Sequence, residues 1–391
     1  MISKRVHEIK PFIVMDVLEK AQAMERAGES IIHLEVGEPD FDTPECIKLS
    51  VIAALQRGET HYTHSLGLLE LREAVRKHYQ KTYGIEGIQP DQVIITSGTS
   101  PAFFVALSAI LDPGDEVILS DPHYACYPNF IRFFGGIPTA VPVYEEDGFQ
   151  YRPESIRAHL TARTKAIFIN SPANPTGNLL EAGRMSEIAG LGKLILSDEI
   201  YHGLVYEGRA RSILEFTDHC IVFNGFSKLY AMTGLRLGYF IVPSELIRPI
   251  QKILQNFFIS ANASVQQAGY TALTDPCVEA EITRMKETYN GRRKFIIKRL
   301  RDMGFGITVE PTGAFYVFAN AKRFTTDSYA FAFEVLEHAK VGITPGVDFG
   351  PNGEGYIRFS YANSMENIAE GLDRLERYLQ KRIAASSPNP I

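Results

Sequence analysis

The sequence predicts a large α/β domain with a mainly parallel central sheet, joined to a smaller α+β domain. Two observations predict the large domain: short, strongly apolar β-branched runs, and segments of helical period that alternate with them. A third observation predicts the small domain, because long charged helices with a few short strands follow residue 276. We divide the chain into residues 1–45 (an N-terminal arm and the first part of the small domain), 46–277 (the large domain) and 278–391 (the rest of the small domain).

The predicted elements follow from these periods in chain order. Residues 12–27 have helical period and end at Gly28, and we expect this helix to join the small domain or a neighbouring subunit. The apolar runs predicted as interior strands are residues 93–96, 116–119, 166–170, 194–197, 221–223 and 237–242. The helices predicted among them are residues 102–111, 124–134 and 181–189, an alternation typical of crossovers between parallel strands.

The small domain has its own predicted elements. They are a long charged helix at residues 278–303, a strand at 314–319, a helix at 329–339, a strand at 356–361 and a closing helix at 364–381. The Ser/Pro/Asn-rich end, residues 384–391, is predicted to fray.

Composition and charge exclude several classes of protein. The chain has 391 residues, of which 45% are hydrophobic and 22% charged, which is typical of a globular protein with a large core. A net charge of -6 without single-signed blocks gives nucleic acid no electrostatic binding surface. No stretch approaches the roughly 18 apolar residues that span a bilayer, so we predict a soluble, cytoplasmic protein without a membrane partner.

The four cysteines lie far apart in the sequence. They are Cys46, Cys126, Cys220 and Cys277, and they show neither CxxC nor Cys/His ligand spacing. This pattern predicts neither a disulfide framework nor a zinc site, and no other metal site is predicted. A reducing compartment fits it best.

One lysine stands between two apolar strands. Residues 224–239, NGFSKLYAMTGLRLGY, carry Ser227, Lys228 and Arg236 there. Lysine is normally exposed, so a lysine directly after a buried strand is expected to have a lowered pKa and to be a candidate amine nucleophile. Taken alone, the segment also fits an ordinary surface turn.

Carboxylate and amide side chains follow two other apolar strands. Residues 194–202, LILSDEIYH, end a strand at Asp198, and residues 169–177, INSPANPTG, present Asn174 between two prolines. The carboxyl ends of parallel strands are where α/β folds bind ligands. The alternatives are a helix N-cap at Asp198 and a proline-fixed turn around Asn174.

A glycine turn precedes one of the predicted helices. Residues 94–102, IITSGTSPA, read as strand, turn and helix, so free backbone N–H groups and the helix dipole would form an anion cradle. The turn matches neither dinucleotide-binding nor P-loop patterns, and taken alone it is a simple connection. Together, the four segments supply an amine nucleophile, a carboxylate, neutral donors and a phosphate cradle, which are the parts that a pyridoxal phosphate site requires.

The same segments resemble the class I/II aminotransferases of fold type I, the aspartate aminotransferase superfamily. The resemblance runs from GEPDFDTP at Gly37 to YIRFSYAN at Tyr356, with several motifs in the same order. It implies a three-layer large domain, pyridoxal 5'-phosphate as the cofactor, and a homodimer with shared active sites. It also implies an amino acid and a 2-oxo acid as substrates, and a role in amino-acid metabolism.

The resemblance implies roles for the residues that match the family motifs. Lys228 would form the internal aldimine, and Asp198 would pair with the pyridine nitrogen. Asn174 and Tyr201 would hydrogen-bond the ring 3-hydroxyl oxygen. Lys228, Asp198 and Tyr201 form the predicted catalytic set.

The remaining predicted roles concern the cofactor phosphate, the ring face and the substrate. The phosphate clamp is predicted to consist of Thr99, Ser100, Ser227 and Arg236, with Tyr62 of HYTHSLG reaching the phosphate of a neighbouring subunit. Tyr124 of DPHYACYP would stack on the ring. Arg358 would hold the substrate α-carboxylate with help from Gly37 and Asn174, an assignment that rests wholly on the resemblance.

One departure from the family pattern bears on the substrate. Aspartate-using relatives of this branch place a lysine where this chain has Ser100, which argues against aspartate. The predicted pocket is instead aromatic, and its candidate residues are Phe12, Tyr124, Tyr127, Phe257 and Phe258.

The sequence therefore predicts an aminotransferase that works by a ping-pong route, with Lys228 as the base that moves the proton. A pyridoxal-phosphate β-lyase acting on cysteine conjugates is the nearest alternative, because it would use the same residues. A cofactor-binding domain of a transcription regulator lacks the basic module that it would need. A dehydrogenase lacks the GxGxxG turn.

Overall fold

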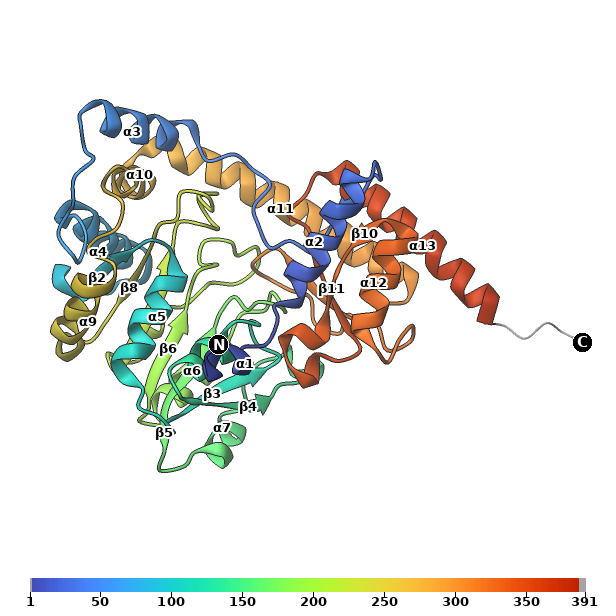
Figure 1. The fold of residues 1–391 in the computed structure, drawn as a ribbon, viewed down its shortest axis with the longest axis horizontal. Helices are drawn as coiled ribbons and strands as arrows, with labels where there is room; N and C mark the ends of the chain where they lie inside the picture. The colour runs from blue at the N-terminus through green and yellow to red at the C-terminus, as the bar shows by residue number, and fades with distance from the viewer. Residues whose placement is uncertain (1, 387–391) are drawn as a thin grey trace, which may run out of the picture.

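The computed structural model describes residues 2–386, which form two packed parts around separate cores (Figure 1). Within that range, no helix is both long and apolar enough to cross a bilayer. The predicted cytoplasmic location stays a prediction. The predicted fraying of residues 384–391 falls mostly outside the described residues, and its first three residues belong to the last helix.

The larger part is built on a seven-stranded sheet. Its strands are β2 (Val93–Thr96), β3 (Glu116–Asp121), β4 (Ile137–Pro142), β5 (Thr164–Asn170), β6 (Leu194–Asp198), β7 (Cys220–Gly225) and β8 (Gly238–Ile241). Their order across the sheet is β2-β8-β7-β6-β5-β3-β4, and β8 alone runs antiparallel to its neighbours. The predicted mainly parallel sheet is confirmed.

Helices cover both faces of this sheet. They are α3 (Glu45–Gln56), α4 (Leu69–Tyr83), α5 (Thr99–Ile110), α6 (Tyr127–Phe133), α7 (Pro153–His159), α8 (Ala182–Ala189), α9 (Ser244–Phe257) and α10 (Ala263–Thr274). Successive strand residues point to opposite faces, so Ile167 lies in one core cluster and Phe168 in the other. Two cores flanking one sheet confirm the predicted three-layer arrangement.

The smaller part combines two small sheets with long helices. Its elements are α2 (Ile13–Arg26), β1 (Ile32–His33), α11 (Pro276–Met303), β9 (Tyr316–Asn320), α12 (Ser328–Ala339), β10 (Val341–Gly342), β11 (Thr344–Pro345), β12 (Tyr356–Ser360) and α13 (Met365–Ser386). β1 pairs with β10, and β11, β12 and β9 form an antiparallel sheet. The helix predicted at residues 12–27 is α2 and joins this part, because its Val17 and Ala21 pack against Leu336 of α12.

Short helices complete the chain. They are α1 (Lys4–Glu8) and the 3₁₀ helices η1 (Pro90–Gln92), η2 (Glu145–Asp147), η3 (Ile213–Glu215), η4 (Gly346–Phe349) and η5 (Pro351–Gly353). The proposed domain division at residues 45 and 277 stays a prediction, and its second boundary falls within the first turn of α11.

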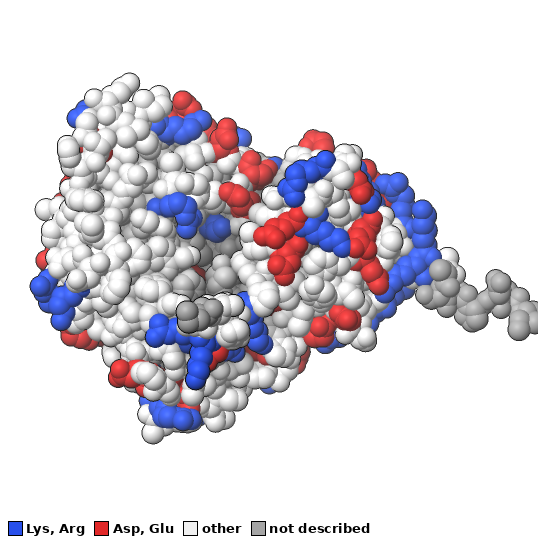
Figure 2. Space-filling view, in the orientation of Figure 1, with Lys and Arg blue, Asp and Glu red and all other residues white. Residues whose placement is uncertain are grey.

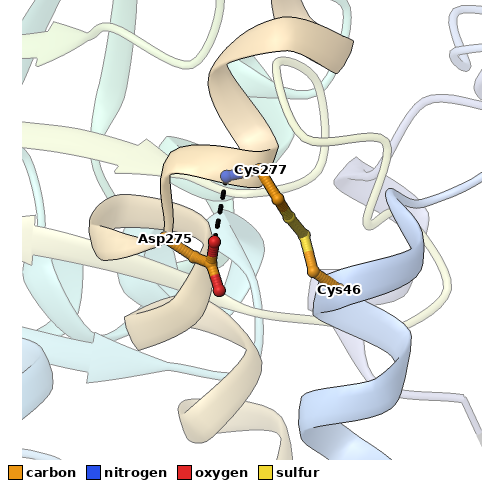
Figure 3. Close-up of side chains that lie close together, drawn as sticks. All are labelled: Cys46, Asp275 and Cys277. Atoms are coloured by element: carbon orange, nitrogen blue, oxygen red, sulfur yellow. Dashed lines mark hydrogen bonds between the residues drawn. A yellow bond between two sulfur atoms is a disulfide. The ribbon is translucent and has the colours of Figure 1, made fainter.

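No disulfide was predicted from the cysteine spacing, and the structure corrects this. Cys46 at the start of α3 and Cys277 at the start of α11 form a disulfide, with their Cα atoms 6.8 Å apart (Figure 3). The two residues are 231 positions apart in the sequence, so no local spacing could reveal the pair. Cys126 and Cys220 are free.

Candidate active site

The carboxyl ends of the parallel strands open into a cavity of about 460 Å³ between the two parts. Figure 2 shows the hollow near the middle of the view, with basic side chains at its border. Every predicted cofactor- or substrate-binding residue except Tyr62 lines it: Gly37, Thr99, Ser100, Tyr124, Asn174, Asp198, Tyr201, Ser227, Lys228, Arg236 and Arg358. Four sequence segments that are far apart in the chain therefore meet at one sheet edge.

Lys228 follows β7 and reaches into this cavity. Its Nζ donates a hydrogen bond of 2.6 Å to the carbonyl oxygen of Gly37, a predicted substrate residue. Burial lowers the pKa of Lys228 from 10.5 to about 8, and the nearby guanidinium groups of Arg358 and Arg236 act in the same direction. The amine is therefore much closer to its neutral, nucleophilic form at pH 7 than an exposed lysine is.

Asp198 ends the central strand β6, and its side chain is 5% exposed. Its carboxylate accepts hydrogen bonds of 2.6 Å from the Tyr127 hydroxyl and 3.1 Å from the Ile200 amide. Burial raises the pKa of Asp198 to about 6, although both hydrogen bonds act to lower it. Both donors are neutral, so the buried charge can still be balanced by a cationic ligand.

Tyr127 was missed as a contact of Asp198, although the sequence placed it among the pocket aromatics. It lies three residues after Tyr124, at the start of α6, and its ring stacks on Phe168 with centroids 4.1 Å apart. The motif DPHYACYP does carry a signal, because a buried tyrosine needs a hydrogen-bond partner. Only the fold shows that the partner is Asp198.

Asn174 and Tyr201 both line the cavity. The Asn174 backbone N–H donates to Asn170 Oδ1 at 2.7 Å, which fixes the loop after β5. The hydroxyl of Tyr201 lies 2.8 Å from that of Tyr316 on β9. Tyr316 was not predicted, and it belongs to the small part, so it links the two halves of the site.

The predicted phosphate clamp gathers at the start of α5. Gly98 precedes this helix with φ 97°, and a Cβ at that position would lie 2.6 Å from Arg236 Nη2. Glycine is therefore needed for the guanidinium to approach the backbone. Thr99, Ser100, Ser227 and Arg236 all face the same cavity as the free N–H groups of the helix.

Arg358 lies on β12 and is 2% exposed. Its guanidinium donates to Asn174 Oδ1 at 2.9 Å, to the Glu35 carbonyl at 2.5 Å and to Thr344 Oγ1 at 3.2 Å. The rings of Tyr316 and Phe349 lie 4.5 and 4.9 Å from it. These contacts hold a planar bidentate donor at the cavity wall.

Two groups of predicted residues lie outside the cavity of this chain. Tyr62 is 80% exposed. Among the aromatic candidates, Phe12, Tyr124 and Tyr127 line the cavity, but Phe257 and Phe258 do not. Phe257 ends the amphipathic helix α9 and is 72% exposed, and Phe258 follows it, so their place in the pocket stays a prediction.

The family model for aminotransferase class I and II matches residues 29–375. The chain belongs to the class I and II aminotransferases. As a member of that family it is a pyridoxal-phosphate-dependent aminotransferase, and the predicted fold, enzyme class and cofactor are confirmed.

Named relatives of this aminotransferase differ in substrate. A (5-formylfuran-3-yl)methyl phosphate transaminase of Methanocaldococcus jannaschii is 45% identical, over 97% of this chain and 100% of the relative. An aspartate aminotransferase of Pyrococcus horikoshii is 39% identical, over 97% of both chains. A crystal structure from Methanococcus jannaschii, described as similar in its active site to kynurenine aminotransferases, matches with a TM-score of 0.90 and 45% identity, over 97% of this chain and 100% of that one.

The residues present fit pyridoxal phosphate. The start of α5 with Arg236 offers backbone N–H groups and a cation to a phosphate, and Asp198 offers a buried carboxylate to a protonated ring nitrogen. Lys228 offers an amine to the cofactor aldehyde.

Proposed function

We propose that this aminotransferase moves an amino group from an L-amino acid to a 2-oxo acid in two alternating half-reactions. The observation that carries the proposal is that Lys228, Asp198 and Arg358 face one cavity, with a lowered pKa on the amine. An amine whose pKa lies near neutral pH can form a bond with a carbonyl carbon and can later accept or donate a proton.

The residues divide the work in the proposed reaction. Pyridoxal phosphate, when bound, supplies a carbonyl carbon for the amino group and a ring that accepts electrons. Asp198 would hold the ring nitrogen protonated, and Asn174 with Tyr201 would hydrogen-bond the ring hydroxyl oxygen. Tyr124 would cover the ring face.

Lys228 Nζ would hold the cofactor before the substrate arrives and then move a proton at the substrate Cα. Its position next to Gly37 supports this role, because Gly37 lines the same cavity and is predicted to help hold the substrate. Arg358 would grip the α-carboxylate, and its partner Asn174 would lie beside it. The gripped carboxylate would turn the Cα–H bond toward Lys228.

We also propose that the donor has a neutral side chain. The positively charged side chains that line the cavity within residues 2–386 are Lys228, Arg236 and Arg358, and each has a proposed role. Ser100 supplies no charge to the cavity. Arg5 of the N-terminal arm does not line the cavity either, and its guanidinium lies over the Phe133 ring. A distal carboxylate entering beside Phe12, Met15 and Leu18 would lose hydration without a cationic partner.

Half-reactions test both proposals. The cofactor-loaded enzyme is mixed with alanine, methionine, phenylalanine or aspartate alone, and the absorbance change and the released 2-oxo acid are measured. We expect release before any acceptor is added, and we expect a neutral donor to have the highest kcat/KM. A tenfold preference for aspartate, about 1.4 kcal/mol of transition-state stabilisation, would contradict the neutral pocket.

The acceptor and the lyase alternative are tested with the same enzyme. Acceptors are 2-oxoglutarate, pyruvate and (5-formylfuran-3-yl)methyl phosphate, the last because the relative that is 45% identical is named for it. Release of ammonia and pyruvate from a cysteine conjugate faster than transamination would favour the β-lyase.

We propose that two copies form a homodimer with shared sites. Apolar side chains are exposed on a contiguous stretch of α3, where Leu49, Ile52 and Leu55 are 50–54% exposed. Tyr62 follows this helix and lies outside the cavity of its own chain. A second copy covering this face would bury the apolar side chains. It would also bring Tyr62 of one copy toward the phosphate clamp of the other.

Mixing two defective variants tests the shared site. Lys228→Ala lacks the amine, and Tyr62→Phe lacks the hydroxyl proposed to serve the other subunit. A hybrid dimer contains one site with both defects and one with neither, so activity should recover at limiting cofactor. Unchanged activity on mixing, or a fully active monomer in sedimentation, would contradict sharing.

A further inference from the structure

The Cys46–Cys277 disulfide joins the first turns of α3 and α11, which pack on the same core cluster of the large part through Ile47 and Val278. Cys46 is the second residue of α3 and is half-buried, and Cys277 is the second residue of α11 and is exposed (Figure 3). Asp275 caps α11, accepting a 2.9 Å hydrogen bond from the Cys277 N–H. Small thiols and disulfides in solution can therefore reach Cys277.

Cys46 is the last residue of a segment that contacts the loop of the active-site lysine. We call this segment, residues 37–46, the brace. At its start, the Gly37 carbonyl accepts from Lys228 Nζ. Further along, Thr43 Oγ1 donates to the Ala231 carbonyl at 2.6 Å, and Glu38 accepts from the Thr233 hydroxyl. The brace therefore contacts the loop that carries Lys228 at three points.

The brace is also attached to α11 at two points. Arg292 Nη1 forms an ion pair of 2.8 Å with Asp40 Oδ1 in the middle of the brace. The disulfide forms the second attachment and is the covalent one. The first turn of α11 packs in the core of the large part, and the rest of the helix runs into the small part, where it packs against α13. The bond therefore ties the support of Lys228 to the start of the helix that connects the two parts.

We infer that Cys46 and Cys277 form a redox-modification site whose oxidised state stabilises the brace and, through it, the Lys228 loop. The site exchanges with low-molecular-weight disulfides and thiols. A closed loop of this length restricts the unfolded chain strongly, so the bond favours the folded state. The inference goes beyond the aminotransferase activity. Its first test counts the free thiols and does not depend on that activity.

The exchange balances with glutathione as the co-reactant. One cysteine thiolate attacks oxidised glutathione and releases one glutathione thiolate, and the second cysteine attacks the mixed disulfide and releases another. Two electrons pass from the two protein thiols to glutathione disulfide, and the two protons that the protein thiols lose are taken up by the two glutathione thiolates. Reduction runs the same steps backward.

Thiol counting tests the bond itself. The full-length protein is equilibrated with oxidised or reduced glutathione, denatured in alkylating reagent and weighed by mass spectrometry. Of the four cysteines, two should be modified in the oxidised protein and four in the reduced protein. Cys46→Ser should give three in the reduced state, and in the oxidised state two plus one bound glutathione, because no second cysteine can resolve the mixed disulfide on Cys277. Four modified cysteines in the oxidised wild type, or zinc bound with Cys46, Asp275 and Cys277, would overturn the inference.

Thermal stability and activity test the consequence. Reduction should lower the Tm of the wild type by roughly 5 °C and shorten the half-life of activity on heating. The double variant Cys46→Ser/Cys277→Ser, treated identically, controls for effects of the reductant. Its Tm should match the reduced wild type and should not respond to glutathione. A response in the double variant equal to that of the wild type would contradict the role of this pair.

Asp275 provides an independent kinetic test. Its carboxylate lies within 4.8 Å of both sulfur atoms, so it repels an approaching glutathione thiolate. Asp275→Asn keeps a capping side chain but removes the charge. Reduction should become several-fold faster at low salt, and the difference should shrink at high salt. An unchanged rate would place the attack elsewhere.

Discussion

Replacing Lys228 by alanine is expected to abolish transamination, with a loss of about 10⁴-fold or more. The variant loses both the amine that would hold the cofactor and the group that would move the proton. Lys228 lies between the buried strand β7 and Arg236, and its Nζ faces the cavity. Steady-state rates with natural cofactor measure the loss, and borohydride treatment followed by peptide mapping identifies the lysine that binds the cofactor.

The pH dependence of cofactor binding checks the same residue. A lysine amine attacks only when neutral, and burial lowers the pKa of Lys228 to about 8. The rate of cofactor incorporation into cofactor-free protein should therefore rise with pH, reach half of its maximum near pH 8 and level off above that, well below the pH at which an exposed lysine loses its proton. A cofactor adduct on another lysine, or a rate still rising at pH 10, would contradict the assignment. Lys228→Arg is the matched control, because it keeps a long cationic side chain.

Most strands of the large sheet could be predicted because the pattern that marks each strand lies within a few consecutive residues. Strands such as β5 and β6 are buried on both faces and read as continuous apolar runs. β4 was missed because it is an edge strand with proline at two positions and an exposed face. Helices α3, α4, α9 and α10 were not assigned from the sequence. α3 and α10 have weak amphipathic patterns, since much of their surface is apolar.

The site was predictable only in part. Lys228, Asp198 and Asn174 follow strands of one sheet, and the topology rule for parallel strands brings them together. Tyr316, Thr344 and the Glu35 carbonyl come from other segments, and no periodicity connects them with Arg358. The Cys46–Cys277 pair was missed for the same reason.

Asp198→Ala should retain some cofactor through the phosphate clamp but lose transamination by more than roughly a hundredfold. Without a carboxylate at this position, nothing would hold a proton on the nitrogen of a bound cofactor ring, which would then accept electrons poorly. Tyr127 could not compensate, because its hydroxyl donates to Asp198 and burial raises its own pKa well above the usual value. Cofactor content by absorbance and kcat with a neutral donor measure the two effects separately. A rate near that of the wild type would refute the role.

Asp198→Asn should lose the transaminase activity and also the pH dependence of stability that a buried carboxyl group causes. Burial raises the pKa of Asp198 to about 6, so the folded, cofactor-free protein binds more protons than the unfolded chain between about pH 4 and 6. Its stability should therefore fall as pH rises through that range, by up to about 3 kcal/mol for a shift of roughly two pKa units. The asparagine variant cannot ionise and should lack this decline, although it should be as inactive as the alanine variant. Thermal melts of both cofactor-free proteins from pH 4 to 7 measure the difference. Parallel curves would show that Asp198 carries no buried charge, and the proposed pairing with a cationic ring would lose its electrostatic basis.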